Sequence, residues 1–396
     1  MPNEESRIRI RISTGELERR WKAVRQEMKE KNLDFLVMQS HTDILGGYVR
    51  WFTDLPAIHN YTVTLIFARE EGMTMISHGG NPPAKPSPPE WAARGLKNRI
   101  SLPFLPSLNY SNDLMAEKAV KELTKHKNSR IGFVGMGFIT AALYTYLMKH
   151  LPGTKFEDAT DLVDDLKAIK SDEEIKYLKE VCANQDAAFE YALTCIKPGR
   201  RDYEVCEDVR HKCMELGGEQ TNIMGSSAPP GTPLKMMPVF FCNKVIQEGD
   251  QFNLLIESSG TSGLWTEISR MMCLGEVTSE LEEHFAMCQE AQKLSLNLLK
   301  PGASPGDIWD ANNEFMKKRG LTEETRIFAH GMGYDMVERP CIAQEETMKI
   351  KARMNLAIHP SVVSEKAAGL VCDNYIISEK GENICLHKTP QKIFEV

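Results

Sequence analysis

The chain has 396 residues, 42% hydrophobic and 26% charged, which is typical of a globular protein with two or three domains. No stretch approaches about 18 consecutive apolar residues, and the charged N-terminal sequence lacks the apolar core of a signal peptide, so we expect no membrane-spanning helix and a cytoplasmic location. The net charge of −7 and the scattered basic residues argue against nucleic acid or membrane partners and favour a small-molecule substrate.

The first part of the chain alternates helical and strand-like segments. An amphipathic helix is predicted at Gly15–Asn32, and the proline-rich stretch Asn81–Gly95 predicts a surface loop. The pattern also predicts strands at Asp34–Gln39, Tyr61–Phe67, Gly72–His78, Arg130–Met136 and Lys155–Asp158, with helices at Asn112–Lys127 and Ile139–Leu151. Alternation of this kind indicates an α/β domain over residues 1–160.

The remainder of the chain, residues 161–396, begins with helices. The segment Asp161–Ile196 is helical for most of its length, and Ser171 supplies the N-cap of its long second helix. Pro198 and Gly199 end that helix. Further helices are predicted at Asp202–Leu216 and Ser279–Leu299, with turn-rich sequence and strands between them.

A series of motifs in this second part resembles the creatinase/aminopeptidase P/methionine aminopeptidase family, in order and in spacing. They lie at Ala168–Phe189, Ile196–Val205, Gln247–Gly260, Trp265–Met272, Leu298–Gly320, His330–Gly333, Met354–Pro360 and Cys372–Gly381. The resemblance implies an α/β (α+β) protein, with an N-terminal creatinase-like α/β domain followed by a C-terminal pita-bread domain. In that domain two sheets lie between outer helices, and the active site lies between the sheets.

The family's peptidases hold two metal ions through two Asp, one His and two Glu. The motifs place Glu257 and Glu267 at the Asp positions, His330 at the His position, and His359 and Cys372 at the Glu positions. Every replacement can still bind a metal, and the N/N/S/O character of the set suits one borderline ion such as zinc or iron.

The spacing of the first two positions departs from the peptidase pattern. Glu257 and Glu267 are ten residues apart, one fewer than in most of the peptidases, as in the dimethylsulfoniopropionate lyase branch of the family. Ile256 or Leu255 could therefore occupy the first position instead of Glu257.

Two substrate-facing histidines of the peptidases are also missing. One position is Val337, and the other falls near Pro238. Valine cannot donate a proton or bind a scissile carbonyl, so the resemblance argues against peptide hydrolysis by the family mechanism.

Four functions follow from these observations. The main hypothesis is a hydrolase or lyase that cleaves a C–N or C–S bond in a small non-peptide substrate, with one divalent ion. A metal-free creatinase-like enzyme would use His330 for proton transfer and Glu257, Glu267 and Glu338 to hold a cationic group. The other two alternatives are an Xaa-Pro-type metallopeptidase with altered ligands and a binding protein without catalysis.

Several other residues are candidates for smaller roles. Asp335, five residues after His330, could act as a base, and Tyr334 could contact the substrate. In the first domain, Trp51, His59 and Tyr61 lie near the segment that reaches the neighbouring active site in family dimers, and an aromatic lining would suit a cationic methylated substrate. The resemblance also implies a homodimer.

Overall fold

The computed structural model describes residues 11–40, 47–56, 61–78, 94–103, 113–126 and 128–396. Within these residues the chain forms two compact units, an amino-terminal unit at Arg11–Lys167 and a carboxy-terminal unit at Ala168–Val396. The sequence prediction began the second domain at residue 161, seven residues earlier. Among the described residues, none of the helices combines the length and apolar character needed to cross a membrane.

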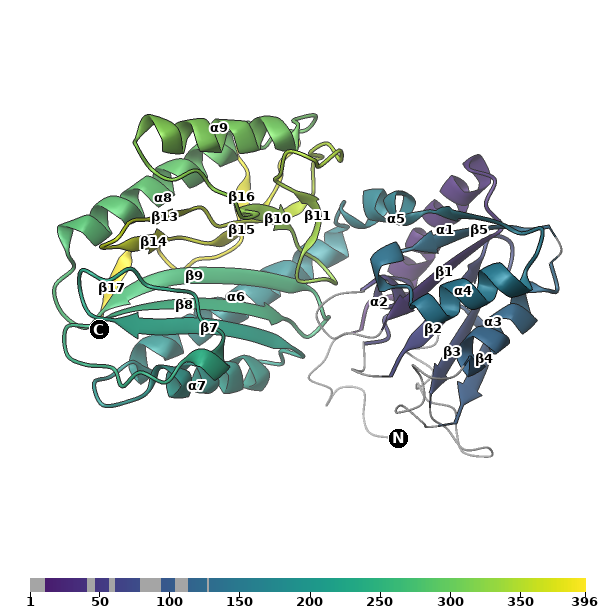
Figure 1. The fold of residues 1–396 in the computed structure, drawn as a ribbon, viewed down its shortest axis with the longest axis horizontal. Helices are drawn as coiled ribbons and strands as arrows, with labels where there is room; N and C mark the ends of the chain where they lie inside the picture. Colours follow the sequence, from purple (N-terminus) through teal and green to yellow (C-terminus); the bar gives the residue numbers. More distant parts are fainter. Residues whose placement is uncertain (1–10, 41–46, 57–60, 79–93, 104–112, 127) are drawn as a thin grey trace. The chain divides into compact units, whose positions relative to one another are not determined.

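The amino-terminal unit is built on a six-stranded mixed sheet with the order β4-β3-β2-β1-β5-β6. The central strand β1 is parallel to β5 and antiparallel to β2. Helices α3 and α4 bury apolar side chains against one face of this sheet (Figure 1). Its strands are β1 (Phe35–Ser40), β2 (Val63–Ala68), β3 (Met73–His78), β4 (Leu96–Leu102), β5 (Arg130–Val134) and β6 (Lys155–Asp158), and its helices are α1 (Thr14–Glu30), α2 (Tyr48–Thr53), α3 (Leu114–Leu123), α4 (Ala141–His150) and α5 (Thr160–Lys167).

Most of the predicted elements of this unit are present, with boundaries shifted by a few residues. Helix α1 begins after Ser13, whose side chain accepts a hydrogen bond from the backbone of Glu16. Strand β4 was not predicted, because its sequence LKNRISL mixes charged and apolar residues. The predicted loop at Asn81–Gly95 lies outside the described residues except for its last two positions.

The carboxy-terminal unit contains two larger sheets and a small hairpin. One sheet has the order β17-β9-β8-β7 and the other β11-β10-β12-β15-β16, while β13 and β14 form a pair. This arrangement confirms the predicted α/β architecture with a pita-bread domain. The strands are β7 (Thr221–Ala228), β8 (Gln251–Ser259), β9 (Trp265–Cys273), β10 (Ala329–Gly331), β11 (Glu338–Cys341), β12 (Asn355–Ile358), β13 (Ser361–Val363), β14 (Ala368–Leu370), β15 (Asp373–Ile376), β16 (Ile384–Cys385) and β17 (Ile393–Glu395).

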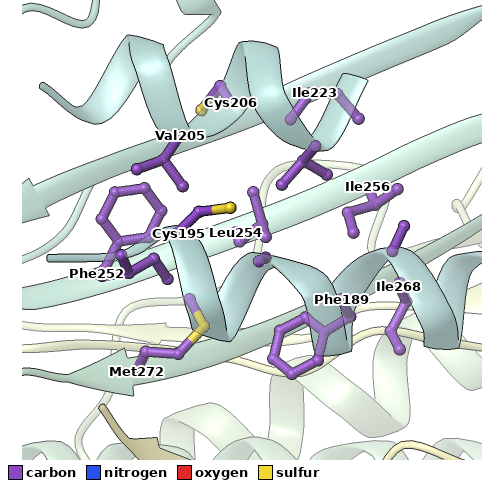
Figure 2. Close-up of a cluster of buried hydrophobic side chains, with 14 of the residues drawn as sticks. Phe189, Cys195, Val205, Cys206, Ile223, Phe252, Leu254, Ile256, Ile268 and Met272 are labelled. Carbon is purple, nitrogen blue, oxygen red and sulfur yellow. The ribbon is translucent and has the colours of Figure 1, made fainter. Parts of the chain in front are cut away.

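Helices cover the outer faces of the two larger sheets. Apolar side chains of α6 and α7 pack against alternate residues of β7, β8 and β9, as Figure 2 shows for Phe189, Val205 and Ile256. Residues of α8 and α9 pack against the second sheet in the same way. Burial of these apolar faces leaves the inward-facing residues of the strands to line the interior between the sheets. The helices are α6 (Asp172–Cys195), α7 (Asp202–Glu215), α8 (Ser279–Leu298) and α9 (Pro305–Lys318).

The predicted N-cap at Ser171 is present as a capping box. Its hydroxyl accepts from the backbone N–H of Glu174, and the Glu174 carboxylate accepts from the backbone N–H of Ser171. This reciprocal pair of hydrogen bonds fixes the start of α6 directly after Lys170.

The two larger sheets are joined at Ser269 and Cys372, whose backbones hydrogen-bond to each other. The neighbouring Arg270 is fully buried and donates to the carbonyl of Cys372, the carboxylate of Asp373 and the carbonyls of Thr389 and Pro390. The chain after these carbonyls continues into β17, which pairs in parallel with β9. The segment Thr389–Glu395 therefore ties the end of the chain to the centre of the unit.

Candidate metal centre

The first sheet presents two glutamates side by side on its inner face. In the antiparallel register of β8 and β9, Glu257 lies opposite Glu267, and Ile256 lies opposite Ile268. Because side chains alternate along a strand, both isoleucines point into the core under α6 and α7, while both glutamates point to the other face. Glu257, and not Ile256, therefore stands beside Glu267. Leu255 lies two residue pairs further along the strands, opposite Ser269.

The second sheet brings two imidazoles to the same place. His330 lies in β10, and His359 directly follows β12, the strand that pairs with β10. Their ring centroids are 5.2 Å apart. One possible ligand atom from each of Glu267, His330 and His359 lies within 4.8 Å of the other two. Three of the five predicted ligands thus form a cluster, with His359 Nε2 3.6 Å from Glu267 Oε1.

Cys372 contacts this cluster through Glu267. Its Sγ lies 2.9 Å from Glu267 Oε1, and the whole residue is buried. Burial, together with the negative charge of Glu267, raises the pKa of the Cys372 thiol well above its usual range. In this structure the Cys372 thiol therefore donates to Glu267, and its role as a metal ligand stays a prediction.

Glu257 is also a neighbour of the three clustered residues. Burial and the adjacent Glu267 carboxylate raise the pKa of Glu257 well above its ordinary value. The amide of Asn222 in β7, the residue opposite Glu257 in the sheet, donates to Glu257 Oε2. Asn222, Glu257 and Glu267 thus form a polar row across three strands.

The state of the two imidazoles leaves lone pairs for a cation. His330 Nδ1 lies 3.0 Å from the carbonyl of Gly331, and because a carbonyl only accepts, Nδ1 carries the proton and Nε2 the lone pair. Burial lowers the pKa of His359 to about 4, so this ring is neutral near pH 7.

Glu267 is the most constrained member of the cluster. Burial raises its pKa, but His359, His330 and the Cys372 thiol outweigh burial, so the pKa of Glu267 is lowered. The Cys372 thiol donates to this carboxylate at 2.9 Å. The backbone N–H of Glu267 donates to the side chain of Asn374 in the second sheet at 2.7 Å, which fixes it between the sheets.

The structure gives Glu338 a different environment from the one predicted. Glu338 Oε2 accepts from Lys170 Nζ at 2.8 Å in an ion pair whose two side chains are only 2% and 3% exposed. A carboxylate already paired with a buried ammonium is not free to hold a cationic substrate. Asp335 and Tyr334 are likewise buried, at 5% and 4% exposure, and Gly333 accepts a backbone hydrogen bond from Trp265 beside them.

The structure describes two of the three candidate substrate-binding residues of the amino-terminal unit. Trp51 is 1% exposed, with its ring against Phe52 and the Arg20 guanidinium, so it belongs to the core of its unit and offers no surface to a substrate. Tyr61 is partly exposed and stays a prediction. His59 lies outside the described residues.

Comparison with known proteins identifies the family. The profile of metallopeptidase family M24 matches residues 176–380, and the profile of the creatinase/prolidase N-terminal domain matches residues 20–169. The chain therefore belongs to the M24 family and is placed among its hydrolases.

Individual relatives span most of the chain. An uncharacterised hydrolase/peptidase of Sinorhizobium fredii is 24% identical and covers 96% of both chains. An Xaa-Pro dipeptidase of Pyrococcus furiosus is 26% identical over 57% of this chain and 65% of its own length. A solved Xaa-Pro dipeptidase from Bacillus anthracis superimposes with a TM-score of 0.75 at 20% identity, covering 96% of this chain and all of that one, which shows the shared fold.

The donor set of the cluster fits a divalent ion. Glu267, His330 and His359 supply one carboxylate and two imidazoles, a set found in mononuclear zinc hydrolases. Glu257 and Cys372 are not members of the three-residue cluster, and both lie against Glu267. Among the described residues no Arg or Lys forms an ion pair with Glu267, so a bound cation would not compete with a basic side chain for this carboxylate.

Proposed function

We propose that this protein is a hydrolase or lyase that uses a single divalent ion to cleave a C–N or C–S bond in a small non-peptide substrate. The observation that carries the proposal is the convergence of Glu267, His330 and His359 from two sheets onto one place. A zinc or iron ion, when bound, would polarise the substrate and activate water. Glu257, which Asn222 holds beside that place and whose pKa is raised, is suited to give a proton to a departing amine or thiolate.

Loss of the peptidase histidines supports a non-peptide substrate. Val337, at one of those positions, has an aliphatic side chain that can neither donate a proton nor hydrogen-bond a carbonyl. The other position is near Pro238, whose backbone pairs with Met224 at the edge of β7. A small substrate that reaches the ion and Glu257 directly has no need of either histidine.

Elemental analysis of protein purified without added metal tests the proposal. We expect about one zinc or iron per chain, and removal by chelator should abolish turnover of whichever compound is processed in a panel of creatine, betaines, sulfonium acids, ectoine and amides. Less than about 0.1 metal per chain, with activity that survives chelator, would reject the metal-dependent mechanism in favour of metal-free, creatinase-like chemistry. His330→Ala should lose metal, whereas His211→Ala, at an exposed position on α7, should retain it.

A second candidate, an Xaa-Pro dipeptidase, is favoured by the names of the relatives. Cleavage of a proline dipeptide panel by the metal-reconstituted protein would support it and would show that the absent histidines are dispensable. A third, binding without catalysis, requires His330→Ala to leave every measurable function intact. We also propose a homodimer of this chain, which sedimentation analysis would test.

A further inference from the structure

The ion pair between Lys170 and Glu338 is buried within the carboxy-terminal unit, close to the metal centre in the fold. Its partners are 168 residues apart in the sequence, and their side chains are 2% and 3% exposed. Burying two charges rarely stabilises a protein relative to apolar side chains of the same shape. We therefore expect this pair to have a role other than stabilising the fold.

Both partners are held by backbone contacts on their own sides. Lys170 donates its backbone N–H to the carbonyl of Arg353, and the Arg353 guanidinium donates back to the carbonyl of Lys170 at 2.7 Å. Glu338 lies in β11 and uses its second oxygen, Oε1, to accept from the backbone N–H of Asp335 at 3.1 Å. The pair thus connects the start of α6 to the segment that runs from His330 to Glu338.

The backbone of that segment rests directly on the pair. A Cβ atom at Gly333 would lie 2.6 Å from both carboxylate oxygens of Glu338 and 2.6 Å from Lys170 Nζ. Only glycine allows the chain to come this close. On the other side, the carbonyl of Gly333 accepts from the backbone of Trp265, two residues before Glu267. The segment is therefore clamped between the ion pair and the strand that carries Glu267.

The clamp extends to the imidazole of His330. Gly331 pairs with Glu338 between β10 and β11, and the register shifts between His330 and Gly331. The carbonyl of Gly331 is also the acceptor for His330 Nδ1, a contact that helps to set the orientation of the ring that clusters with His359 and Glu267. A displacement of Glu338 therefore moves the group that sets the direction of the His330 ring.

We infer that Lys170 and Glu338 are positioning residues, which orient His330 toward Glu267 and His359 by fixing the segment Gly331–Val337. This inference rests on the proposed metal centre for its consequence but concerns the geometry of the chain itself. Residues that orient a metal ligand without touching the ion are known to change metal affinity by about 10- to 100-fold when replaced.

Two double variants separate positioning from stability. Lys170→Met with Glu338→Leu removes both charges and the acceptor for Asp335. Lys170→Met with Glu338→Gln removes both charges but keeps an acceptor, the Gln side-chain oxygen. We expect the Leu variant to bind cobalt(II) about 10- to 100-fold more weakly and with altered visible absorption bands. The Gln variant should bind about 3- to 10-fold more weakly, because it keeps the acceptor for Asp335 but loses the contact with Lys170. Gly333→Ala, which keeps both charges, should weaken cobalt binding in the same direction as the Leu variant.

A matched control removes a buried pair elsewhere. Glu16→Leu with Arg20→Met, in the amino-terminal unit, eliminates an ion pair of similar burial and should leave cobalt binding unchanged. A crystal structure of the Leu variant, or of Gly333→Ala if the Leu variant does not fold, gives a readout that needs no metal: His330 should leave the 4.8 Å cluster with Glu267 and His359. An intact cluster with parental cobalt affinity would overturn the inference. Failure of the parent to bind any metal would instead reject the proposed function, while the crystal structure still decides the role of the pair.

Discussion

Two buried carboxylates of the carboxy-terminal unit, Glu267 and Asp373, have opposite surroundings. Asp373 is fully buried and accepts from Arg270 at 2.7 Å and from the Gln391 amide at 2.6 Å, with His387 Nδ1 at 3.4 Å. Glu267, 2% exposed, has a thiol, a second carboxyl group and two imidazoles around it. A carboxylate paired with a buried guanidinium is a structural anchor, whereas one without an Arg or Lys partner can still take up a cation.

Removing the charge at Glu267 should have the largest effect. Glu267→Gln is expected to lower bound metal from about one to below about 0.1 per chain, because Gln is a poor substitute for a carboxylate ligand. The metal-free variant should lose some stability relative to the metal-free parent, because the lowered pKa of Glu267 means that folding favours its charged form. Elemental analysis and urea denaturation measure the two effects, and a loss as large as about 3–5 kcal/mol would make Glu267 an anchor like Asp373.

Breaking the anchor should instead destabilise the fold. Arg270→Met leaves Asp373 without its guanidinium and should lower the free energy of unfolding by about 3–5 kcal/mol, the usual cost of stripping one partner from a buried ion pair. Urea denaturation provides the measurement. A decrease below about 1 kcal/mol would show that His387 and Gln391 suffice for Asp373.

The contribution of His387 to the anchor should depend on pH. Burial lowers its pKa, but the neighbouring Cys182 and Asp373 outweigh burial and raise the pKa of His387 to about 10. A group whose pKa is raised on folding contributes its full stabilisation below the unfolded value near 6.5 and loses it as pH rises through the folded value. The stability difference between the parent and His387→Asn should therefore be largest at pH 6 and shrink toward pH 10. Urea denaturation at pH 6, 8 and 10 measures this difference, and one that stays constant would mean that His387 is neutral throughout.

Replacing Cys372 should have the smallest effect of these changes, and its effect on metal binding tells whether the thiol is a hydrogen-bond donor or a metal ligand. Cys372→Ser keeps a hydrogen-bond donor to Glu267, so cobalt(II) affinity should change by less than about tenfold. A loss of more than about a hundredfold, or loss of a sulfur-to-metal charge-transfer band, would make Cys372 a ligand after all. Cys385→Ser, at an exposed position of the same unit, is the matched control.

The sequence was sufficient for the fold and for the residues that meet at the centre, because each candidate ligand lies within a motif of recognisable order. The sequence was not sufficient to choose between Glu257 and Ile256. A shift of one residue reverses the face of a strand, and only the pairing of β8 with β9 shows which of the two residues faces Glu267. Asn222 was missed because it lies 35 residues from Glu257 in the sequence, and only the register of β7 and β8 places the two side by side.

Other site features depend on contacts that no local pattern contains. The partner of Glu338 is Lys170, 168 residues away, and a carboxylate near an active-site motif reads as functional until that partner is known. Trp51 looked like a ring for a cationic substrate, and a cation does lie against it, but that cation is the chain's own Arg20.

The pairing of β17 with β9 has a consequence for how this unit is made. Strand β9 carries Glu267, and the strand that borders it, Ile393–Glu395, follows more than a hundred residues later. During synthesis on the ribosome, the edge of β9 remains without β17, and Arg270 without the carbonyls of Thr389 and Pro390, until almost the whole described chain has emerged.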